Sequence, residues 1–439
     1  MNLEQLRDTM RQAGVARLFA KRLSPNDNAK NQIYLGKSFE VLQLLPIGEI
    51  APRPSTKTPI LGATLRLSWL MHDGRHAMAP HSKLILYPQY PEVRLSGFLR
   101  GCEAAPSVLM NTRLSGRILF LGVKSGSEIV AFAAPAGSEC SREFEHLFPD
   151  PEDGVLVELP ISGVAAEAGS PARLIRELRR IHESNWIDSK QLSADGSVQA
   201  CNAPQCGGYT LEAELGVAKN GKAEPDFDGW EVKQHAVSSL DAPPDGKPIT
   251  LLTPEPSGGF YTDHGAAAFV RRFGYPDQNG IEGRLNFGGI FRVGSTAPLT
   301  SLRLVLRGFD EPTGAMVDAS GAVEIVDDEG TVAASWSFAK LIEHWSRKHA
   351  LAVYVPSMKR DEPRRQYRYG RHVRLARHTN GLMLLRAIAS GAVYYDPAIK
   401  LEVNGTAEAT KRRSQFRVHS RELWRLYGAF ESVDVSSPS

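Results

Sequence analysis

The stretch at 224–235 reads Glu-Pro-Asp-Phe-Asp-Gly-Trp-Glu-Val-Lys-Gln-His and constrains this chain more than any other part of it. Pro225 opposes a helix and favours a turn before a strand. Glu231 and Lys233 flank a valine, so on a strand their side chains share one face. Asp226 adds a second carboxylate. Two converging carboxylates can bind a hard cation such as Mg²⁺, and a nearby lysine can orient or deprotonate a water for phosphodiester hydrolysis.

The same spacing has a simpler explanation, because many strands carry Glu-x-Lys as a solvated, salt-bridged face. The flanking segments favour the catalytic interpretation. Upstream, 207–215 reads Gly-Gly-Tyr-Thr-Leu-Glu-Ala-Glu-Leu, a glycine-rich lead into a helical turn, and downstream 249–253 is an apolar strand. The order helix, acidic turn, Glu-x-Lys strand and second strand is that of the α/β core of PD-(D/E)xK nucleases.

From about residue 186 to the C-terminus, the chain resembles the MvaI/BcnI restriction endonuclease family. The matching segments are 208–215, 224–235, Leu-Leu-Thr-Pro-Glu-Pro at 251–256 and Arg-Ser-Gln-Phe-Arg-Val at 413–418. The resemblance implies a PD-(D/E)xK restriction-endonuclease-like fold for residues 171–439.

The resemblance also implies roles for individual residues. Asp226 and Glu231 correspond to ligands of Mg²⁺, for which Mn²⁺ can substitute, Lys233 to the catalytic lysine, and Glu212 to a helix glutamate near the metal. Two neighbouring acids are interpreted differently, Asp228 as a turn former and Glu214 as an exposed helix charge. His235 follows on the face of Lys233, where it is either a structural histidine or a phosphate contact.

Length and composition bound the remaining possibilities. The 439 residues suffice for two or three domains, and the net charge of +3 is only mildly basic. No apolar run approaches the roughly 20 residues that span a bilayer, so we expect a cytoplasmic protein with no membrane partner. The four cysteines are expected to be free thiols, since no second pair completes a zinc site and the cytosol is reducing. They are Cys102, Cys140, Cys201 and Cys206.

Residues 1–165 have a different pattern from the remainder. After one short amphipathic helix, apolar runs recur with turn residues between them, at 60–70, 83–87, 117–123, 128–134 and 154–159. Many short strands at regular spacing predict an all-β barrel or sandwich. Small residues at 161–170 mark the domain boundary, and an amphipathic helix starting at Pro171 follows. Further on, we expect strands within 302–335, a helix at 338–345 and a buried strand at 351–355.

Two polar segments of the N-terminal domain, 21–28 and 94–101, combine cations with amides or glycines. They are either ordinary solvated turns or loops that contact DNA. Both resemble the EcoRII-type N-terminal DNA-binding domain, a pseudobarrel related to the plant B-three fold that grips an effector copy of the target with two arms. By this resemblance the DNA contacts are Lys21, Arg22, Asn26 and Asp27 on one arm and Arg94 and Arg100 on the other.

Basic residues concentrate again at 359–377 and at 411–425. Such runs are commonly solvated faces, but beside a metal site they favour a phosphate-lined cleft. In the MvaI/BcnI family, residues near 411–417 contact bases, and Arg417 matches a family arginine. Arg412 and Arg413 stand where the family has histidines, so the resemblance does not determine which bases they would read.

The sequence therefore predicts a type II restriction endonuclease that cuts double-stranded DNA with Mg²⁺. The resemblances imply a short CC-x-GG-like site, a monomer, and an N-terminal domain that binds a second copy of the site. Two alternatives stay open: a nicking or repair endonuclease, and a sequence-specific DNA-binding protein without cleavage.

Overall fold

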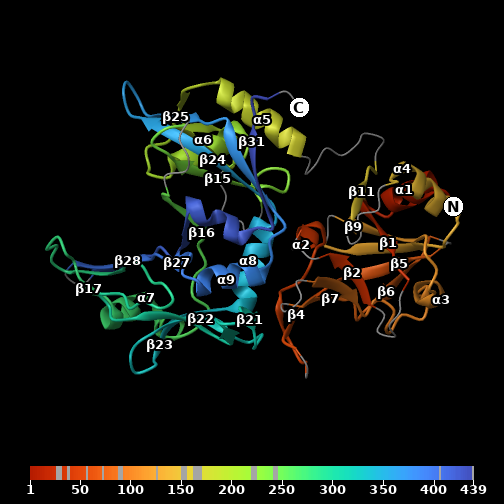
Figure 1. Cartoon of the computed structure of the whole chain (residues 1–439), viewed down its shortest axis with the longest axis horizontal. Coiled ribbons are helices and arrows are strands. Elements are labelled where there is room, and N and C mark those ends of the chain that lie inside the picture. Colours follow the sequence, from red (N-terminus) through yellow and green to blue (C-terminus); the bar gives the residue numbers. More distant parts are fainter. Residues whose placement is uncertain are drawn as a thin grey trace. The chain divides into compact units, whose positions relative to one another are not determined.

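The computed structural model describes residues 1–25, 32–36, 40–55, 58–71, 74–87, 92–124, 127–149, 156–161, 171–218, 225–240, 246–404 and 407–437. Two predicted DNA contacts, Asn26 and Asp27, lie outside these residues. The chain divides into two compact units, Met1–Glu167 and Ala168–Ser439, each with its own sheets and core (Figure 1).

The N-terminal unit is built mainly of strands in two sheets, with strand orders β11-β1-β9-β10-β5-β6 and β2-β8-β7-β4-β3. Its strands are β1 (Val15–Leu23), β2 (Gln32–Gly36), β3 (Ala51–Arg53), β4 (Ile60–Thr64), β5 (Leu67–Leu70), β6 (His76–Ala79), β7 (Lys83–Tyr87), β8 (Glu92–Ser96), β9 (Arg117–Lys124), β10 (Ile129–Ala134) and β11 (Val157–Leu159). Its helices are α1 (Leu3–Gln12), α2 (Glu40–Leu44), α3 (Ser107–Asn111) and α4 (Glu139–Leu147).

The core of this unit forms where α1 and α4 cover the sheet of β1, β9 and β10. Asn2 and Gln5 form a capping box that starts α1, which places Leu6 and Met10 in the core. The predicted run at 60–70 is not one strand, because the chain leaves the five-stranded sheet after β4 and enters the six-stranded sheet with β5. The prediction of a predominantly β unit is otherwise consistent with these two sheets.

The C-terminal unit mixes helices with several sheets. Its helices are α5 (Pro171–Glu183), α6 (Cys206–Glu214), α7 (Phe260–Phe273), α8 (Phe338–His349), α9 (Gly381–Ala389) and the 3-10 helix η1 (Ser420–Leu426). Its strands are β12 (Ile187–Asp188), β13 (Lys190–Leu192), β14 (Val198–Ala200), β15 (Glu231–Ala236), β16 (Pro248–Leu252), β17 (Tyr275–Pro276), β18 (Arg284–Gly288), β19 (Arg303–Arg307), β20 (Phe309–Asp310), β21 (Ala315–Met316), β22 (Ala322–Val326), β23 (Val332–Ser337), β24 (Ala352–Arg360), β25 (Gln366–Tyr369), β26 (His372–Arg377), β27 (Val393–Tyr395), β28 (Ala398–Asn404), β29 (Ala407–Lys411), β30 (Phe416–His419) and β31 (Ala429–Asp434).

One sheet of this unit carries the Glu-x-Lys segment. It has the order β12-β25-β24-β26-β31, and β15 runs parallel to β24 with Glu231 opposite Ala352. Helices α5 and α6 supply Leu178 and Leu211 to the core that packs on this sheet. The sequence pattern suggested that the strand at 249–253 follows next in the core, but β16 pairs with β30 in another sheet. Parallel pairing requires a long crossover, and here residues 237–351 form the connection, which ends with α8 directly before β24.

The structure corrects the cysteine prediction at one pair. Cys201 and Cys206 form a disulfide with their Cα atoms 5.7 Å apart, a distance within the range that a disulfide spans. The turn at residues 201–206, which leads into α6, brings the two thiols together, and their spacing alone did not indicate this. Cys102 and Cys140 are free thiols, as predicted, and both are buried. Within the described residues, every helix is too short or too polar to cross a membrane.

Candidate active site

A tight turn holds Asp226 against the start of β15. Asp228 and Gly229 form its two-residue loop, both with positive φ (46° and 83°), the conformation that Asp-Gly favours in a hairpin. The turn folds the chain back, so that the Val232 N–H donates to the Asp226 carboxylate over 2.9 Å. Arg173 of α5 pairs with Asp228 at 2.8 Å and fixes the loop from outside. Asp228 is thus a turn former, as predicted.

Glu231 is the buried centre of the site, with none of its surface exposed. Its Oε1 accepts from Lys233 Nζ at 2.5 Å and lies 3.5 Å from Lys348 Nζ. Its Oε2 is buried and has no hydrogen-bond partner. A buried carboxylate oxygen without a partner is costly, so a cation bound at this atom would be strongly favoured.

Glu212 reaches the site from α6, which packs against β15 (Figure 1). Gly207 makes the close packing possible, because a Cβ there would stand 2.8 Å from Gln234 Oε1 of β15. The Tyr369 hydroxyl donates to the Gly207 carbonyl over 2.7 Å and anchors the start of the helix. The glycine-rich lead noted in the sequence therefore lies close to the Gln234 side chain of β15, at the start of the helix that carries Glu212.

The three carboxylates share one electrostatic environment. Burial and the nearby Asp226 raise the pKa of Glu212 to about 7, and burial and Glu231 raise the pKa of Asp226 to about 6. Burial alone would also raise the pKa of Glu231, but Lys233 and Lys348 outweigh it and lower that pKa to about 2. Although burial opposes its charge, Lys233 also has a raised pKa because of Glu231. The two lysines therefore keep Glu231 charged, while burial and the neighbouring carboxylates disfavour the charged forms of Asp226 and Glu212.

The residues present fit a divalent metal ion. In the part of the chain that the structure describes, no three histidine, cysteine, aspartate or glutamate side chains form a ready-made ligand group. Mg²⁺ does not require one, since it is commonly held by one or two carboxylates together with waters and substrate phosphates. Asp226 and Glu231 supply such an oxygen donor set, and Glu231 Oε2 is the atom that lacks a partner.

Sequence reasoning missed Lys348, which comes from the last turn of α8. The helix end is held by the next residue, because the ring of buried His349 lies 3.0 Å from the Leu251 carbonyl and 3.2 Å from the Tyr427 hydroxyl. Since β24 then pairs with β15, Lys348 is delivered to Glu231 from 117 residues along the chain. The basic triplet that ends this helix was the available signal, but it is also typical of any helix C-terminus.

Other predicted contacts are engaged within the protein. His235 is buried, with 8% of its surface exposed, so the prediction of a phosphate contact is not supported at this residue. Glu214 is not an exposed helix charge, because its half-buried carboxylate pairs with Lys190 at 2.5 Å and with Arg180 at 3.1 Å.

In the N-terminal unit, Lys21 lies in β1 and is buried. Arg22 and Arg94 are occupied by ion pairs inside the unit: Arg22–Glu145 at 2.9 Å and Arg94–Glu92 at 2.6 Å. Each guanidinium also lies over an aromatic ring. Arg100, by contrast, is exposed. Three of the four described contacts predicted here are therefore held by the protein itself.

The two basic runs of the C-terminal unit differ. Much of the first is neutralised by acids: Lys359–Asp361, Arg364–Asp188, Arg365–Asp361, Arg371–Asp434 and Arg377–Glu431. This pairing favours a solvated face there over the predicted phosphate-lined cleft. In the second run, Arg417 pairs with Asp396 at 2.6 Å, while Arg412 and Arg413 are exposed at the end of the β28–β29 hairpin.

A sheet edge with two carboxylates, a lysine and an unpartnered buried oxygen defines a class of protein, the metal-assisted hydrolases of phosphate esters. The chain belongs to the MvaI/BcnI restriction endonuclease family, whose model matches residues 175–427, more than half of the chain. It is a type II site-specific deoxyribonuclease, and enzymes of this kind generally use divalent metal ions.

Two solved structures resemble the chain in part. The restriction endonuclease MvaI in complex with cognate DNA is 17% identical with a TM-score of 0.46, covering 62% of this chain and 99% of MvaI. MvaI without DNA is 16% identical with a TM-score of 0.34, covering 60% and 98%. No curated protein matches the chain significantly.

Proposed function

We propose that this enzyme hydrolyses phosphodiester bonds of double-stranded DNA with Mg²⁺ at the site of Asp226, Glu231, Lys233 and Glu212. The observation that carries the proposal is Glu231 itself: a buried carboxylate with one oxygen paired to Lys233 and the other without a partner. Mg²⁺ held by Asp226 and Glu231 would neutralise charge that develops on the scissile phosphate, and Mn²⁺ would substitute for it.

The side chains divide the remaining work. Lys233 is a cation at neutral pH, since its pKa is raised, so it orients the attacking water and stabilises charge rather than removing a proton. Glu212, with a pKa of about 7, is placed to accept the proton that the water loses. In-line attack on phosphorus then breaks the bond to the 3′ oxygen, which leaves a 5′-phosphate and a 3′-hydroxyl.

The N-terminal unit would bind a second copy of the recognition site. The proposal rests on the likeness of segments 21–28 and 94–101 to the EcoRII-type DNA-binding pseudobarrel, and on the β-rich architecture of Met1–Glu167. A short CC-x-GG-like site is expected, with exposed Arg412 and Arg413 as candidate contacts to the cleaved copy. We also propose that the enzyme is a monomer and acts in the cytoplasm.

Digestion of unmethylated phage DNA with Mg²⁺ tests the proposal. The wild type should give discrete fragments and Lys233→Ala none, while Lys233→Ala still shifts labelled duplex on a gel. Digestion of a supercoiled plasmid in parallel distinguishes a double-strand endonuclease from a nicking enzyme, because a monomer with one active site must cut the two strands in turn. Open circles without linear product would establish nicking, and bound but uncut DNA with the wild type would establish a binding protein.

A further inference from the structure

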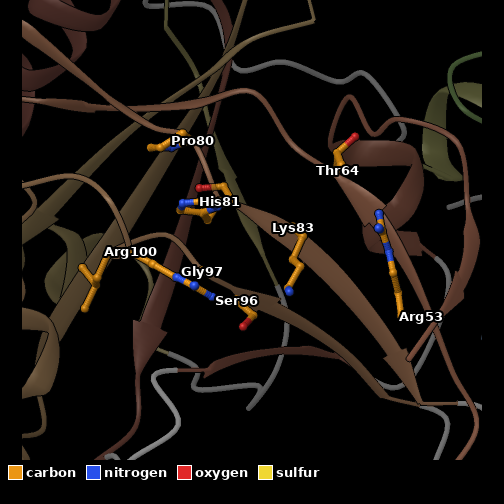
Figure 2. Close-up of a pocket in the computed structure, with 10 residues that line it drawn as sticks. Arg53, Thr64, Pro80, His81, Lys83, Ser96, Gly97 and Arg100 are labelled. Atoms are coloured by element: carbon orange, nitrogen blue, oxygen red, sulfur yellow. The ribbon is translucent and has the colours of Figure 1, made fainter. Parts of the chain in front are cut away.

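A polar pocket of 510 Å³ in the N-terminal unit takes no part in the site described above. It opens beside β3, β4, β7 and β8, and basic residues line it: Arg53, His81, Lys83 and Arg100. Figure 2 places Arg53 with Thr64 on one side of the opening and His81 with Arg100 on the other. The lining includes no aspartate or glutamate.

The positive charge of this pocket is not balanced within the described part of the unit. No ion pair joins Arg53, Lys83 or Arg100 to a described acid, in contrast to Arg22 and Arg94 of the same unit. Three cations that face one opening repel each other, so an anion among them would be stabilised.

Two buried polar atoms in the lining also lack partners. Ser82 is only 3% exposed, and neither its Oγ nor the Nε of Arg53 makes a hydrogen bond. Both groups can donate a hydrogen bond, so an acceptor oxygen placed beside them would satisfy them. A ligand with several acceptor oxygens would satisfy both.

The backbone is shaped to hold these side chains in place. A Cβ at Gly62 of β4 would stand 2.9 Å from Arg53 Cγ, so the missing side chain lets the arginine lie across the sheet. Gly97 has φ +74°, and a Cβ there would stand 2.0 Å from the His81 carbonyl oxygen. Only glycine fits this position, which brings the β8 end against His81. The pocket is therefore built by the fold and is not a chance gap between surface loops.

We infer that this pocket binds the phosphate groups of a nucleotide ligand, either a phosphodiester within a DNA strand or a free nucleotide. Arginine, lysine and hydroxyl donors are the groups that contact phosphate oxygens, and 510 Å³ exceeds what a single small ion needs. In its DNA form the inference rests on the proposed function, in which this unit binds a second duplex. It assigns that contact to Arg53, Lys83 and Arg100 in place of the internally paired Arg22 and Arg94.

Calorimetric titration of full-length Lys233→Ala, which keeps DNA intact, tests the inference with two ligands: a duplex carrying the recognition site, and a deoxynucleoside monophosphate. The pocket variant adds Arg53→Ala and Lys83→Ala. Exposed Arg113, outside the pocket in the same unit, provides the matched control Arg113→Ala. A further pocket variant, Arg100→Ala, removes only an exposed side chain. It provides the same test if the combined Arg53→Ala and Lys83→Ala substitutions disturb folding.

With DNA as the ligand, the parent should bind two duplexes. The pocket variant should bind the second duplex more weakly, and the slope of log affinity against log salt at that site should be smaller by about 2. With a free nucleotide as the ligand, mononucleotide binding should drop at least about tenfold in the pocket variant while the duplex stoichiometry is unchanged. Arg113→Ala should match the parent in both titrations.

The inference is overturned if both titrations of the pocket variants match the parent. A parent that binds one duplex only would refute the two-copy part of the proposed function. In that case the nucleotide titration alone tests the pocket. Nucleotide binding by the parent that is lost in the pocket variants would support the inference. Nucleotide binding that is unchanged in the variants, or absent from the parent, would overturn it.

Discussion

Replacing Glu212 with glutamine should stabilise the metal-free enzyme at alkaline pH. The pKa of Glu212 is raised from 4.5 to about 7 by burial and by Asp226. Between these values the folded state holds a proton that the unfolded chain releases, so the carboxyl group costs stability as the pH rises through this window. The cost reaches about 3 kcal/mol at pH 8 and is less than about 1 kcal/mol at pH 5. Glutamine does not titrate, so the Glu212→Gln protein does not lose this stability as the pH rises.

Urea unfolding in EDTA at pH 5 and pH 8 measures this difference. Tryptophan fluorescence reports mostly on the relevant unit, because five of the six tryptophans lie beyond residue 168, among them buried Trp230 beside the site. Glu214, which lies two residues after Glu212 at the end of the same helix, is the matched control. Its pKa is lowered because Lys190 and Arg180 outweigh burial, so Glu214→Gln should lose stability at pH 8.

Two results would refute the reasoning. One is a Glu212→Gln protein that is no more stable than the wild type at pH 8 without metal. The other is a gain that stays the same at pH 5, since the linkage argument requires it to shrink there. Saturating Mg²⁺ provides a separate check, because the wild type should recover its deficit when a cation neutralises the cluster.

Three further perturbations follow from the geometry of the site. Lys348→Met removes the ammonium 3.5 Å from Glu231, so Mn²⁺ measured by calorimetry without DNA should bind about 3- to 10-fold more tightly; unchanged affinity would contradict the contact. Gly207→Ala should crowd the Gln234 side chain and the Tyr367 ring and lower kcat about 3- to 10-fold with little change in KM for DNA, and a wild-type rate would contradict the packing argument. Arg173→Ala breaks a half-exposed pair with Asp228, so stability should fall by no more than about 1 kcal/mol while the Mg²⁺ concentration for half-maximal cleavage rises.

The N-terminal unit illustrates why charge on a sequence is a poor guide to a binding surface. Arg22 and Arg94 lie in the segments that resembled DNA-binding arms, yet each is paired with an acid inside the unit. Arg53 and Lys83 belong to no conspicuous motif, yet they share an unbalanced pocket with Arg100. Whether an arginine is available depends on which acid the fold places beside it.

The local part of the catalytic site was determined by the sequence alone. Pro225 and Asp228 favour a turn, and the alternation after it places Glu231 and Lys233 on one face of a strand, because both effects act between residues a few positions apart. The position of Glu212 on a helix followed in the same way from the segment before the turn.

Only the tertiary structure decided the rest of the site. The parallel partner of β15 is β24 and not the next strand, because parallel pairing needs a long crossover whose destination leaves no local pattern. That pairing delivers Lys348 to Glu231, and the approach of α6 buries Glu212 beside Asp226, which raises the pKa of Glu212. Burial and charge coupling depend on distances between segments far apart in the chain, and these distances exist only once the sheet has formed.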